Sequence, residues 1–362
     1  MSNERKWNFS PGPAVLPAEP LKKAQVALMD FNSTGIGILE TSHRSKEFLG
    51  VMEQTKGRLK KLLNVPDTHE IIFCQGGANL QFSMIPMNLM DEKKTADYVD
   101  TGTWSTRAIK AAELEGTANV KATSEDKKYT YLPNLNEVSW SDDAAYIHMT
   151  SNNTIYGTQY RTFPDTGEKP LICDMSSDIL SHRLDVSKFG LIYAGAQKNM
   201  GPAGVTVVII RKDLAEKSPT TLPPMLRYKQ YVEKDSAYNT PPTFAIYMVG
   251  LVLEWVEEKG GLEAIEKENE AKAKLLYSTM DEASDFFRGT VAKADRSYMN
   301  VTMRLPSEDL EKKFLAEAAE KNLMSLKGHR SVGGIRVSMY NAMSLQGIEA
   351  LVEFMNAFRK NA

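Results

Sequence analysis

Lys198 has the sequence surroundings expected of a lysine that reacts with a carbonyl group. It lies in the segment LIYAGAQKNMGPAG (191–204), where an apolar, strand-like run passes into small residues and glycines. Burial disfavours the charged form of lysine and lowers its pKa, and only the neutral amine attacks a carbonyl carbon. An exposed loop lysine is the commoner role of this residue type, but the small neighbours favour a lysine that a flat ring can approach. Lys198 is therefore the candidate Schiff-base lysine.

Asp174 supplies a second group for the same chemistry. It ends the apolar run 170–174, and one strand connection separates it from Lys198. A carboxylate that faces a pyridine nitrogen keeps that nitrogen protonated, so that the ring accepts electrons from a substrate carbanion. A Schiff-base lysine combined with such an aspartate is the requirement of pyridoxal 5′-phosphate (PLP). Because Asp174 alone would also suit a metal or nucleotide site, the hypothesis rests on both residues.

A glycine turn and a tryptophan could complete a site for a planar phosphorylated ring. The segment IIFCQGGANLQF (71–82) reads as a strand, a turn at Gly76-Gly77 and the start of a helix. Backbone N–H groups at a helix start bind anions. The segment matches neither a dinucleotide fingerprint nor a P-loop, and an ordinary tight turn is an equal alternative. Trp104 follows the expected strand 96–100, where an indole can stack on a ring or pack at a helix edge.

Histidine–arginine pairs are the other candidate anion-binding groups. Three of the five histidines directly precede an arginine: His43-Arg44, His182-Arg183 and His329-Arg330. Arginine binds a carboxylate or phosphate through two N–H groups and histidine adds a donor, although each pair could equally lie in a solvated loop. His69 and His148 lack a companion at metal-ligand spacing, so we expect structural roles for them and no metal site.

The composition excludes several classes of protein. The 362 residues carry 44 Lys and Arg against 46 Asp and Glu, a net charge of −2, which argues against a nucleic-acid-binding domain. Cys74 and Cys173 each follow an apolar run, so we expect buried free thiols and no disulfide framework. Residues 1–6 lack the apolar stretch of a signal peptide, and the run 205–210 is too short to span a bilayer. A cytoplasmic protein without a membrane partner is the expectation.

The middle of the chain alternates short apolar runs with helical patterns, which predicts an α/β fold with a mainly parallel sheet. Strands are expected at 70–74, 96–100, 144–149, 170–174, 191–194 and 205–211, and helices at 17–29, 45–63, 78–90 and 104–115. Residues 222–242 read as a long irregular stretch, which is more often functional than idle. An apolar helix at 243–259 and a long charged helix to about 287 follow. The strands 298–305 and 335–339 and the helices 307–322 and 344–360 predict a second α/β domain.

Several motifs in this order closely resemble the phosphoserine aminotransferase family, which belongs to the fold-type I PLP enzymes. The motifs are NFSPGP (8–13), SHRS (42–45), ADYVDTG (96–102), YAGAQKN (193–199), NTPPTF (239–244) and KGHR (327–330). The resemblance covers essentially the whole chain. It implies a large PLP-binding domain, residues 16–258, with a mainly parallel seven-stranded sheet. It also implies a smaller C-terminal α/β domain formed by residues 1–15 and 259–362.

The resemblance implies a role for each matching residue. Lys198 would form the Schiff base with the cofactor, Asp174 would pair with its ring nitrogen and Trp104 would stack on the ring. The remaining cofactor-binding residues would be Thr154, near the ring hydroxyl, and Ala78, Asn79, Gln197, Asn239 and Thr240, at the phosphate. In the family the loop with Asn239 and Thr240 reaches the neighbouring subunit, so the resemblance implies a homodimer with shared active sites.

The implied reaction transfers the amino group from L-glutamate to 3-phosphohydroxypyruvate, giving O-phospho-L-serine and 2-oxoglutarate in serine biosynthesis. His43 and Arg44, with His329 and Arg330 from the other subunit, would bind the substrate carboxylate and phosphate. Some family members carry a phosphate-binding arginine where this chain has Asn79. Some also use 4-phosphohydroxy-threonine of pyridoxine biosynthesis. His182-Arg183 matches no functional motif of the family and is interpreted as a surface or interface pair.

Two other readings stay open at this stage. A fold-type I enzyme of different specificity would be another small-amino-acid aminotransferase, which does not need two His–Arg pairs. It could also be a cysteine desulfurase, which needs a nucleophilic cysteine in an exposed loop. A non-catalytic α/β ligand-binding protein, for example for a nucleotide, would leave Lys198 passive and the purified protein colourless.

Overall fold

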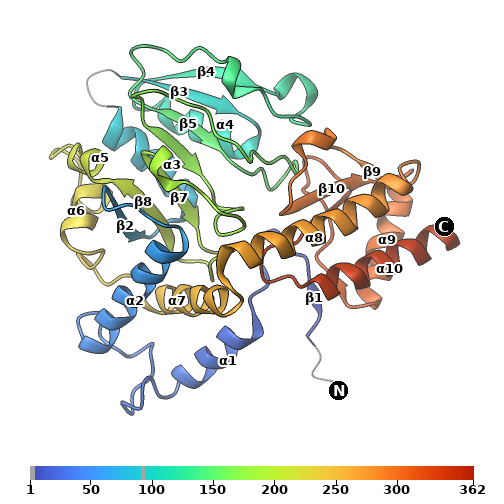
Figure 1. Ribbon diagram of the computed structural model, residues 1–362, viewed down its shortest axis with the longest axis horizontal. Coiled ribbons are helices and arrows are strands. Elements are labelled where there is room, and N and C mark those ends of the chain that lie inside the picture. Colours follow the sequence, from blue (N-terminus) through green and yellow to red (C-terminus); the bar gives the residue numbers. More distant parts are fainter. Residues whose placement is uncertain (1–4, 91–93) are drawn as a thin grey trace.

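The computed structural model describes residues 5–90 and 94–362, and its largest element is a seven-stranded sheet (Figure 1). The strand order is β2-β8-β7-β6-β5-β3-β4. The strands are β2 (His69–Cys74), β3 (Thr95–Asp100), β4 (Thr117–Thr123), β5 (Ile147–Thr150), β6 (Leu171–Asp174), β7 (Leu191–Gly195) and β8 (Thr206–Arg211). Pairing is parallel from β4 to β7, whereas β8 runs antiparallel to both β7 and β2. The predicted α/β fold with a mainly parallel seven-stranded sheet is therefore confirmed.

The sequence patterns missed β4, the strand at the end of this sheet (Figure 1). Its residues TANVKAT are half-buried or exposed. An edge strand packs against one neighbour and is less covered, so it does not need the continuous apolar run that marked the inner strands. The six strands that were expected are all present, with ends shifted by up to three residues.

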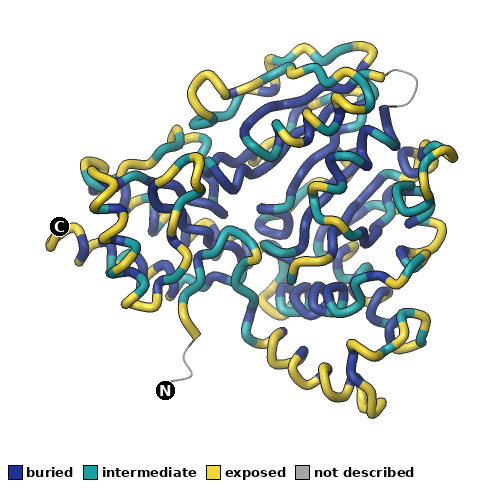
Figure 2. Tube along the Cα trace, turned by 180° about the vertical axis from the view of Figure 1, so that it is seen from behind, coloured by how far each residue is buried: buried dark blue, intermediate teal, exposed yellow. Residues whose placement is uncertain are grey.

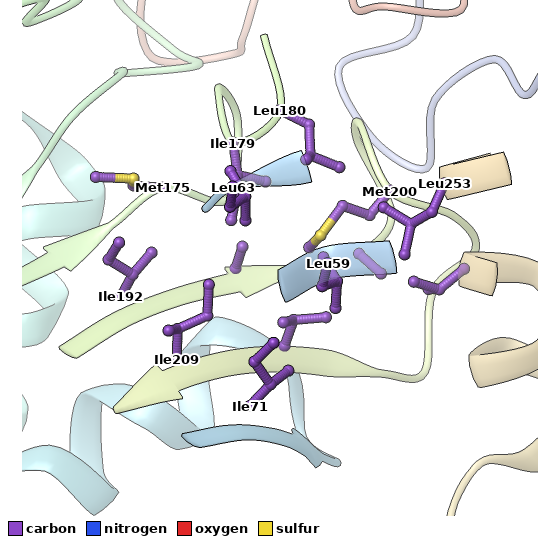
Figure 3. Close-up of a cluster of buried hydrophobic side chains, with 14 of the residues drawn as sticks. Leu59, Leu63, Ile71, Met175, Ile179, Leu180, Ile192, Met200, Ile209 and Leu253 are labelled. Atoms are coloured by element: carbon purple, nitrogen blue, oxygen red, sulfur yellow. The ribbon is translucent and has the colours of Figure 1, made fainter. Parts of the chain in front are cut away.

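Helices cover both faces of the sheet. On one face lie α2 (Lys46–Leu62) and α7 (Thr243–Glu258), and on the other lie α3 (Gly77–Leu89) and α4 (Thr103–Ala112). Alternate strand residues divide between the two cores: Ile192 and Ile209 pack with α2 and α7, whereas Tyr193 packs on the other face. Figure 3 shows Leu59 of α2, Leu63 directly after the end of α2, and Leu253 of α7 in the same cluster as Ile192 and Ile209.

The segment 222–242 contains a short helix that the sequence patterns missed. The helix is α6 (Tyr228–Glu233), which follows α5 (Lys212–Glu216) and packs near β2. The remaining predicted helices are present. They are α1 (Ala18–Ala27), α8 (Gly261–Glu282), α9 (Glu308–Glu320) and α10 (Leu345–Asn361).

The C-terminal part of the chain builds a second, smaller sheet, which lies beside α8 in Figure 1. Its order is β12-β10-β9, from β12 (Ile335–Ser338), β10 (Asn300–Arg304) and β9 (Arg288–Gly289). The N-terminal strand β1 (Trp7–Asn8) pairs with β11 (Leu323–Met324). Phe9 is fully buried in the same core as α8, α9 and α10.

Both cysteines are free and buried on strands, as expected: Cys74 ends the edge strand β2 and Cys173 lies in the inner strand β6. Burial raises the pKa of both thiols. Neither cysteine can therefore act as the exposed nucleophile of a desulfurase. No helix in the described ranges has the length and apolar character to cross a bilayer. Residues 1–4, where the sequence predicts no leader, lie outside those ranges.

Ile209 tests how tightly this sheet face is packed. It is 1% exposed among the side chains shown in Figure 3. We expect Ile209→Ala to lower the free energy of unfolding by about 2–5 kcal/mol, because it removes buried methyl groups and leaves a cavity. Urea unfolding followed by fluorescence would measure the loss. Leu114→Ala, at a residue that is 83% exposed, is the control and should leave the midpoint unchanged. A loss under about 1 kcal/mol for Ile209→Ala would contradict this packing.

Candidate active site

A cavity of about 380 Å³ lies where β5, β6 and β7 end. Crevices at the carboxyl ends of parallel strands are the usual ligand sites of open α/β sheets, and this volume lies at the lower end of the range for small-molecule pockets. The cavity is lined by Gly76, Gly77, Ala78, Asn79, Trp104, Thr150, Asn152, Thr154, Asp174, Ser176, Ser177, Gly195, Gln197, Lys198, Gly204 and Val205. Seven of the residues proposed from the sequence therefore meet in one place.

Lys198 lies in the turn that follows β7, and its side chain is only partly exposed. Its Nζ donates a hydrogen bond of 2.6 Å to Thr154 Oγ1. Burial lowers the pKa of Lys198 to about 8, helped by the charge of Arg336 and opposed by that of Asp174. A substantial fraction of the amine is therefore neutral near pH 8, which is the state a nucleophilic lysine requires.

Asp174 is the last residue of β6 and is 5% exposed. Burial raises the pKa of its carboxyl group, while a hydrogen bond of 2.9 Å from the Ser176 backbone N–H to Oδ1 and the charge of Lys198 act in the opposite direction. A protonated ring nitrogen facing this carboxylate would lower the pKa again, because an opposite charge favours the ionised form.

The glycine turn has the geometry of an anion cradle. Gly76 has a left-handed backbone, with φ of 83°, and caps the N-terminus of α3. A Cβ at Gly76 would lie 2.6 Å from Leu80 Cβ, so a larger residue would displace the first turn of the helix. Ala78 and Asn79 lie in that turn and line the cavity. The first backbone N–H groups of a helix have no partner inside the helix and favour an anion such as phosphate.

Trp104 lies in the first turn of α4 and lines the same cavity. Its ring centroid is 5.8 Å from Lys198 Nζ. Arg107 lies on the same ring, with Cζ 5.0 Å from the centroid. A flat ring attached to Lys198 would thus lie close to an indole, as stacking requires.

The remaining predicted residues lie outside the cavity lining. Asn239 and Thr240 are in the loop before α7, where the Thr240 hydroxyl lies 3.3 Å from His43 Nδ1. Arg44 and Arg330 are exposed. His329 bonds Ser331, with 2.7 Å between Nδ1 and Oγ. The pKa of His329 is lowered by burial and by three arginine charges, those of Arg336, Arg330 and Arg107.

Sequence reasoning missed Arg336, a buried arginine beside the cavity. It lies in β12, is 7% exposed, and donates a hydrogen bond of 3.3 Å from Nη1 to the backbone oxygen of Thr154. Its Nε is buried and makes no hydrogen bond to any described residue. A buried arginine with an unused donor is suited to a carboxylate ligand. The available signal was a lone charge between Ile335 and Val337 in an expected strand.

His182-Arg183 takes no part in the cavity. Arg183 is exposed and pairs with Glu266 of α8, with 2.9 Å between Nε and Oε2. The described residues contain no group of three or more His, Cys, Asp or Glu side chains arranged to hold a metal ion.

The cavity fits PLP in shape and in chemistry. It brings together a partly neutral amine, a buried carboxylate, an indole face and a helix N-terminus. The indole Nε1 of Trp104 is buried without a hydrogen-bond partner among the described residues. Each group of the cofactor (aldehyde, ring nitrogen, ring face and phosphate) therefore has a chemical counterpart among the lining residues.

Comparisons with known proteins agree with this geometry. Residues 6–351 match the family model described as Aminotransferase class-V. The chain belongs to the class-V aminotransferases. It is 55% identical over 357 residues to a phosphoserine aminotransferase of Geobacillus kaustophilus, covering 99% of both chains.

Solved structures of family members are similar along the whole chain. The phosphoserine aminotransferase from Bacillus circulans subsp. alkalophilus superposes with a TM-score of 0.98 at 52% identity, covering 99% of both chains. The PLP-bound phosphoserine aminotransferase from Trichomonas vaginalis has a TM-score of 0.92 at 39% identity, covering 97% of this chain and 100% of that one.

The lowered pKa of Lys198 predicts how the apoprotein responds to pH. We expect the rate at which Lys198 reacts with added pyridoxal 5′-phosphate to rise with pH and to level off above about 8, because the neutral amine is the reactive form. Stopped-flow absorbance across the pH range would measure it. In the Asp174→Asn variant the rate should level off at a lower pH, since the Asp174 carboxylate raises the pKa of Lys198 in the wild type. A rate that keeps rising toward pH 10.5, the value of a free lysine, would contradict the prediction.

Proposed function

We propose that this class-V aminotransferase is a PLP-dependent phosphoserine aminotransferase, which transfers the amino group between L-glutamate and 3-phosphohydroxypyruvate. The observation that carries the proposal is the meeting of Lys198 and Asp174 in one cavity, within a chain that is 55% identical from end to end to a phosphoserine aminotransferase. When bound, the cofactor supplies an electron sink for the α-carbon of the substrate. The chain supplies the binding groups and the proton transfer.

Lys198 is the proposed base of the reaction. Its neutral amine, with a pKa of about 8, would take the proton from the substrate α-carbon, and the resulting ammonium group would give it to the carbon derived from the cofactor aldehyde. Thr154 holds Nζ through the 2.6 Å hydrogen bond. Asp174 would keep the ring nitrogen protonated, because a negatively charged carboxylate beside the nitrogen favours its positively charged form.

The proposed anion sites divide between cofactor and substrate. The backbone N–H groups of Ala78 and Asn79 and the side chain of Gln197 would hold the cofactor phosphate, supported by the helix N-terminus at Gly77. Arg336 would bind the substrate α-carboxylate, because its guanidinium is buried beside Thr154 and keeps a free donor.

The substrate phosphate would be bound by two pairs, His43-Arg44 and His329-Arg330, in which the histidines are half-buried and the arginines exposed. Their support is charge: Arg107, Arg330 and Arg336 all lower the pKa of His329, so several cations face one region beside the cavity. Asn79 is uncharged, so Arg44 and Arg330 would make the charged contacts with the substrate phosphate.

We propose that the enzyme is a homodimer with shared sites. The support is a cluster of exposed apolar side chains on α1, the following loop and the start of α2. It contains Val26, Leu28, Met29, Ile36, Leu39 and Leu49. Val26 and Met29 are 68% and 81% exposed, and α1 is largely exposed in Figure 2. Exposed apolar clusters of this kind mark protein interfaces. Asn239 and Thr240 would reach across it to the cofactor phosphate of the partner.

The proposed domain division places 16–258 in the large domain and 1–15 with 259–362 in the small one. Its support is the pairing of β1 with β11 and the burial of Phe9 in the C-terminal core.

We also propose a cytoplasmic location, in keeping with serine biosynthesis. The related phosphorylated substrate of pyridoxine biosynthesis carries the same carboxylate and phosphate groups and is a further proposed substrate.

Substrate choice tests the proposed reaction. We expect kcat/KM with O-phospho-L-serine as amino donor to exceed that with L-serine or L-alanine by at least about a hundredfold, because neither analogue can use the arginines that bind phosphate. A coupled assay of glutamate formation from 2-oxoglutarate would measure the three donors. Lys198→Ala, the control for a reaction that needs the amine, should abolish activity with all of them. Equal rates for the three donors would refute the phosphate assignment.

Hybrid dimers test the shared sites. Lys198→Ala and Arg330→Ala subunits, co-expressed with different tags, would each be inactive alone at low substrate. If Arg330 serves the neighbouring subunit, one site of each hybrid is intact, and random pairing should restore about a quarter of the wild-type activity. No recovery in the isolated hybrid would show that each site uses its own Arg330.

A further inference from the structure

Lys272 is a charged residue whose surroundings the proposed reaction does not yet explain. It lies in the middle of α8 and its side chain is 0% exposed. Its Nζ donates three hydrogen bonds to backbone oxygens of a single loop: 3.1 Å to Met339, 3.0 Å to Tyr340 and 2.9 Å to Met343. All three donors of the ammonium group are thus used on the loop between β12 and α10.

Holding this charge inside the protein is costly. Burial lowers the pKa of Lys272 to about 7, although Glu268 opposes the effect. None of the ion pairs found in the described residues includes Lys272, and its only hydrogen-bond partners among those residues are the three backbone oxygens. An apolar side chain of similar length would avoid the desolvation cost, and replacing buried charges in this way often preserves stability. The three hydrogen bonds of the ammonium group hold the backbone of the loop, which an apolar side chain could not do.

The loop held by Lys272 contains Tyr340, a fully buried side chain whose hydroxyl group is hydrogen-bonded on two sides. The Tyr340 hydroxyl donates a hydrogen bond of 2.8 Å to the Pro11 backbone oxygen and accepts one of 3.1 Å from Asn300. Burial raises the pKa of this hydroxyl, and its neighbours Asn300, Arg336 and Thr154 oppose the rise. Asn300 in turn accepts a hydrogen bond of 2.8 Å from Asn152, which lines the cavity, so Tyr340 is linked to the cavity wall through these two amides. Two of the three oxygens bound by Lys272 belong to Tyr340 and the residue before it.

A second residue of α8 connects the same loop to the turn that carries Lys198. Asn269, three positions before Lys272, donates a hydrogen bond of 2.9 Å to Asn341 Oδ1. The backbone N–H of Asn341 donates 3.0 Å to Oδ1 of Asn199, the residue that follows Lys198. One face of α8 therefore holds the loop by its backbone and by its side chain, and the loop contacts both substrate-binding and cofactor-binding elements.

We propose that Lys272 is a positioning residue for amino transfer: by fixing the loop 339–343, which directly follows β12, it holds the end of the strand that carries Arg336 and so orients Arg336 toward the substrate carboxylate. The inference rests on the proposed function, since the carboxylate role of Arg336 belongs to it. Lys272 does not line the cavity, and it acts through the loop that follows β12 and through Arg336. Misplacement of such a group by about 1 Å is enough to change a rate by one to two orders of magnitude.

Steady-state kinetics of the Lys272→Met holoenzyme would test the proposal. We expect KM for glutamate and for O-phospho-L-serine to rise about tenfold or more, with kcat and the visible absorbance of the bound cofactor changed far less. Lys198, Asp174 and Trp104 lie in the large sheet region, so cofactor binding should persist. Lys274→Met, two residues along the same helix at an exposed lysine, is the matched control and should behave as wild type.

Two further measurements separate positioning from a purely structural role. On an Arg336→Gln background, Lys272→Met should add little to KM, because both changes would remove the same carboxylate interaction. Additive effects, or a lowered melting temperature with an unchanged KM, would overturn the proposal. If Lys272→Met does not fold, Lys272→Gln keeps one donor group and should give an intermediate KM, and a wild-type KM would overturn the proposal.

The wild-type enzyme in the same assay keeps the two proposals apart. A wild type that transfers amino groups but does not prefer O-phospho-L-serine would refute the proposed substrate and leave the Lys272 comparison valid with glutamate. A wild type with the expected preference and a Lys272→Met variant with unchanged KM would refute the positioning role alone.

Discussion

The burial of the Lys198 amine beside the Asp174 carboxylate is the constraint on which the rest of the structure depends. Burial lowers the pKa of the amine and raises that of the carboxyl group, while their mutual attraction opposes both shifts. Neither group would be reactive in this way on a solvated surface, because water would restore both ordinary pKa values. The chain must therefore bring two separate strand ends into a cavity that is largely shielded from water and still open to a substrate.

The parallel sheet meets this requirement by geometry. β6 and β7 are neighbours in parallel pairing, so the residues that follow their carboxyl ends lie at one edge of the sheet. Cores on both faces hold the strands in register. The first turns of α3 and α4 add the helix N-terminus at Gly77 and the indole of Trp104 to the cavity lining. Packing energy from two apolar cores thus supports a small cluster of polar groups that would be unfavourable by itself.

The second recurrent feature is a buried cation that donates hydrogen bonds to backbone oxygens. Arg336 reaches the Thr154 carbonyl from the small sheet, and Lys272 reaches three carbonyls from α8. An apolar side chain does not fix the position of a neighbouring backbone oxygen in this way. A charged donor does, because much of the interaction energy is lost when the acceptor moves. The contact of Arg336 joins the C-terminal sheet to Thr154, which lines the cavity, and those of Lys272 join α8 to the loop that follows this sheet.

The sequence by itself determined much of this protein, because the decisive signals are local. Apolar runs identified every inner strand, and Lys198, Asp174 and the Gly76-Gly77 turn stood out because each follows such a run. The edge strand β4 was missed because its half-buried residues carry no apolar pattern. Only the tertiary structure shows that Arg336 reaches the cavity-lining Thr154 and that Lys272 holds the loop that contains Tyr340. Their partners are backbone oxygens and side chains far away in the chain, and such contacts leave no periodicity or spacing in the sequence.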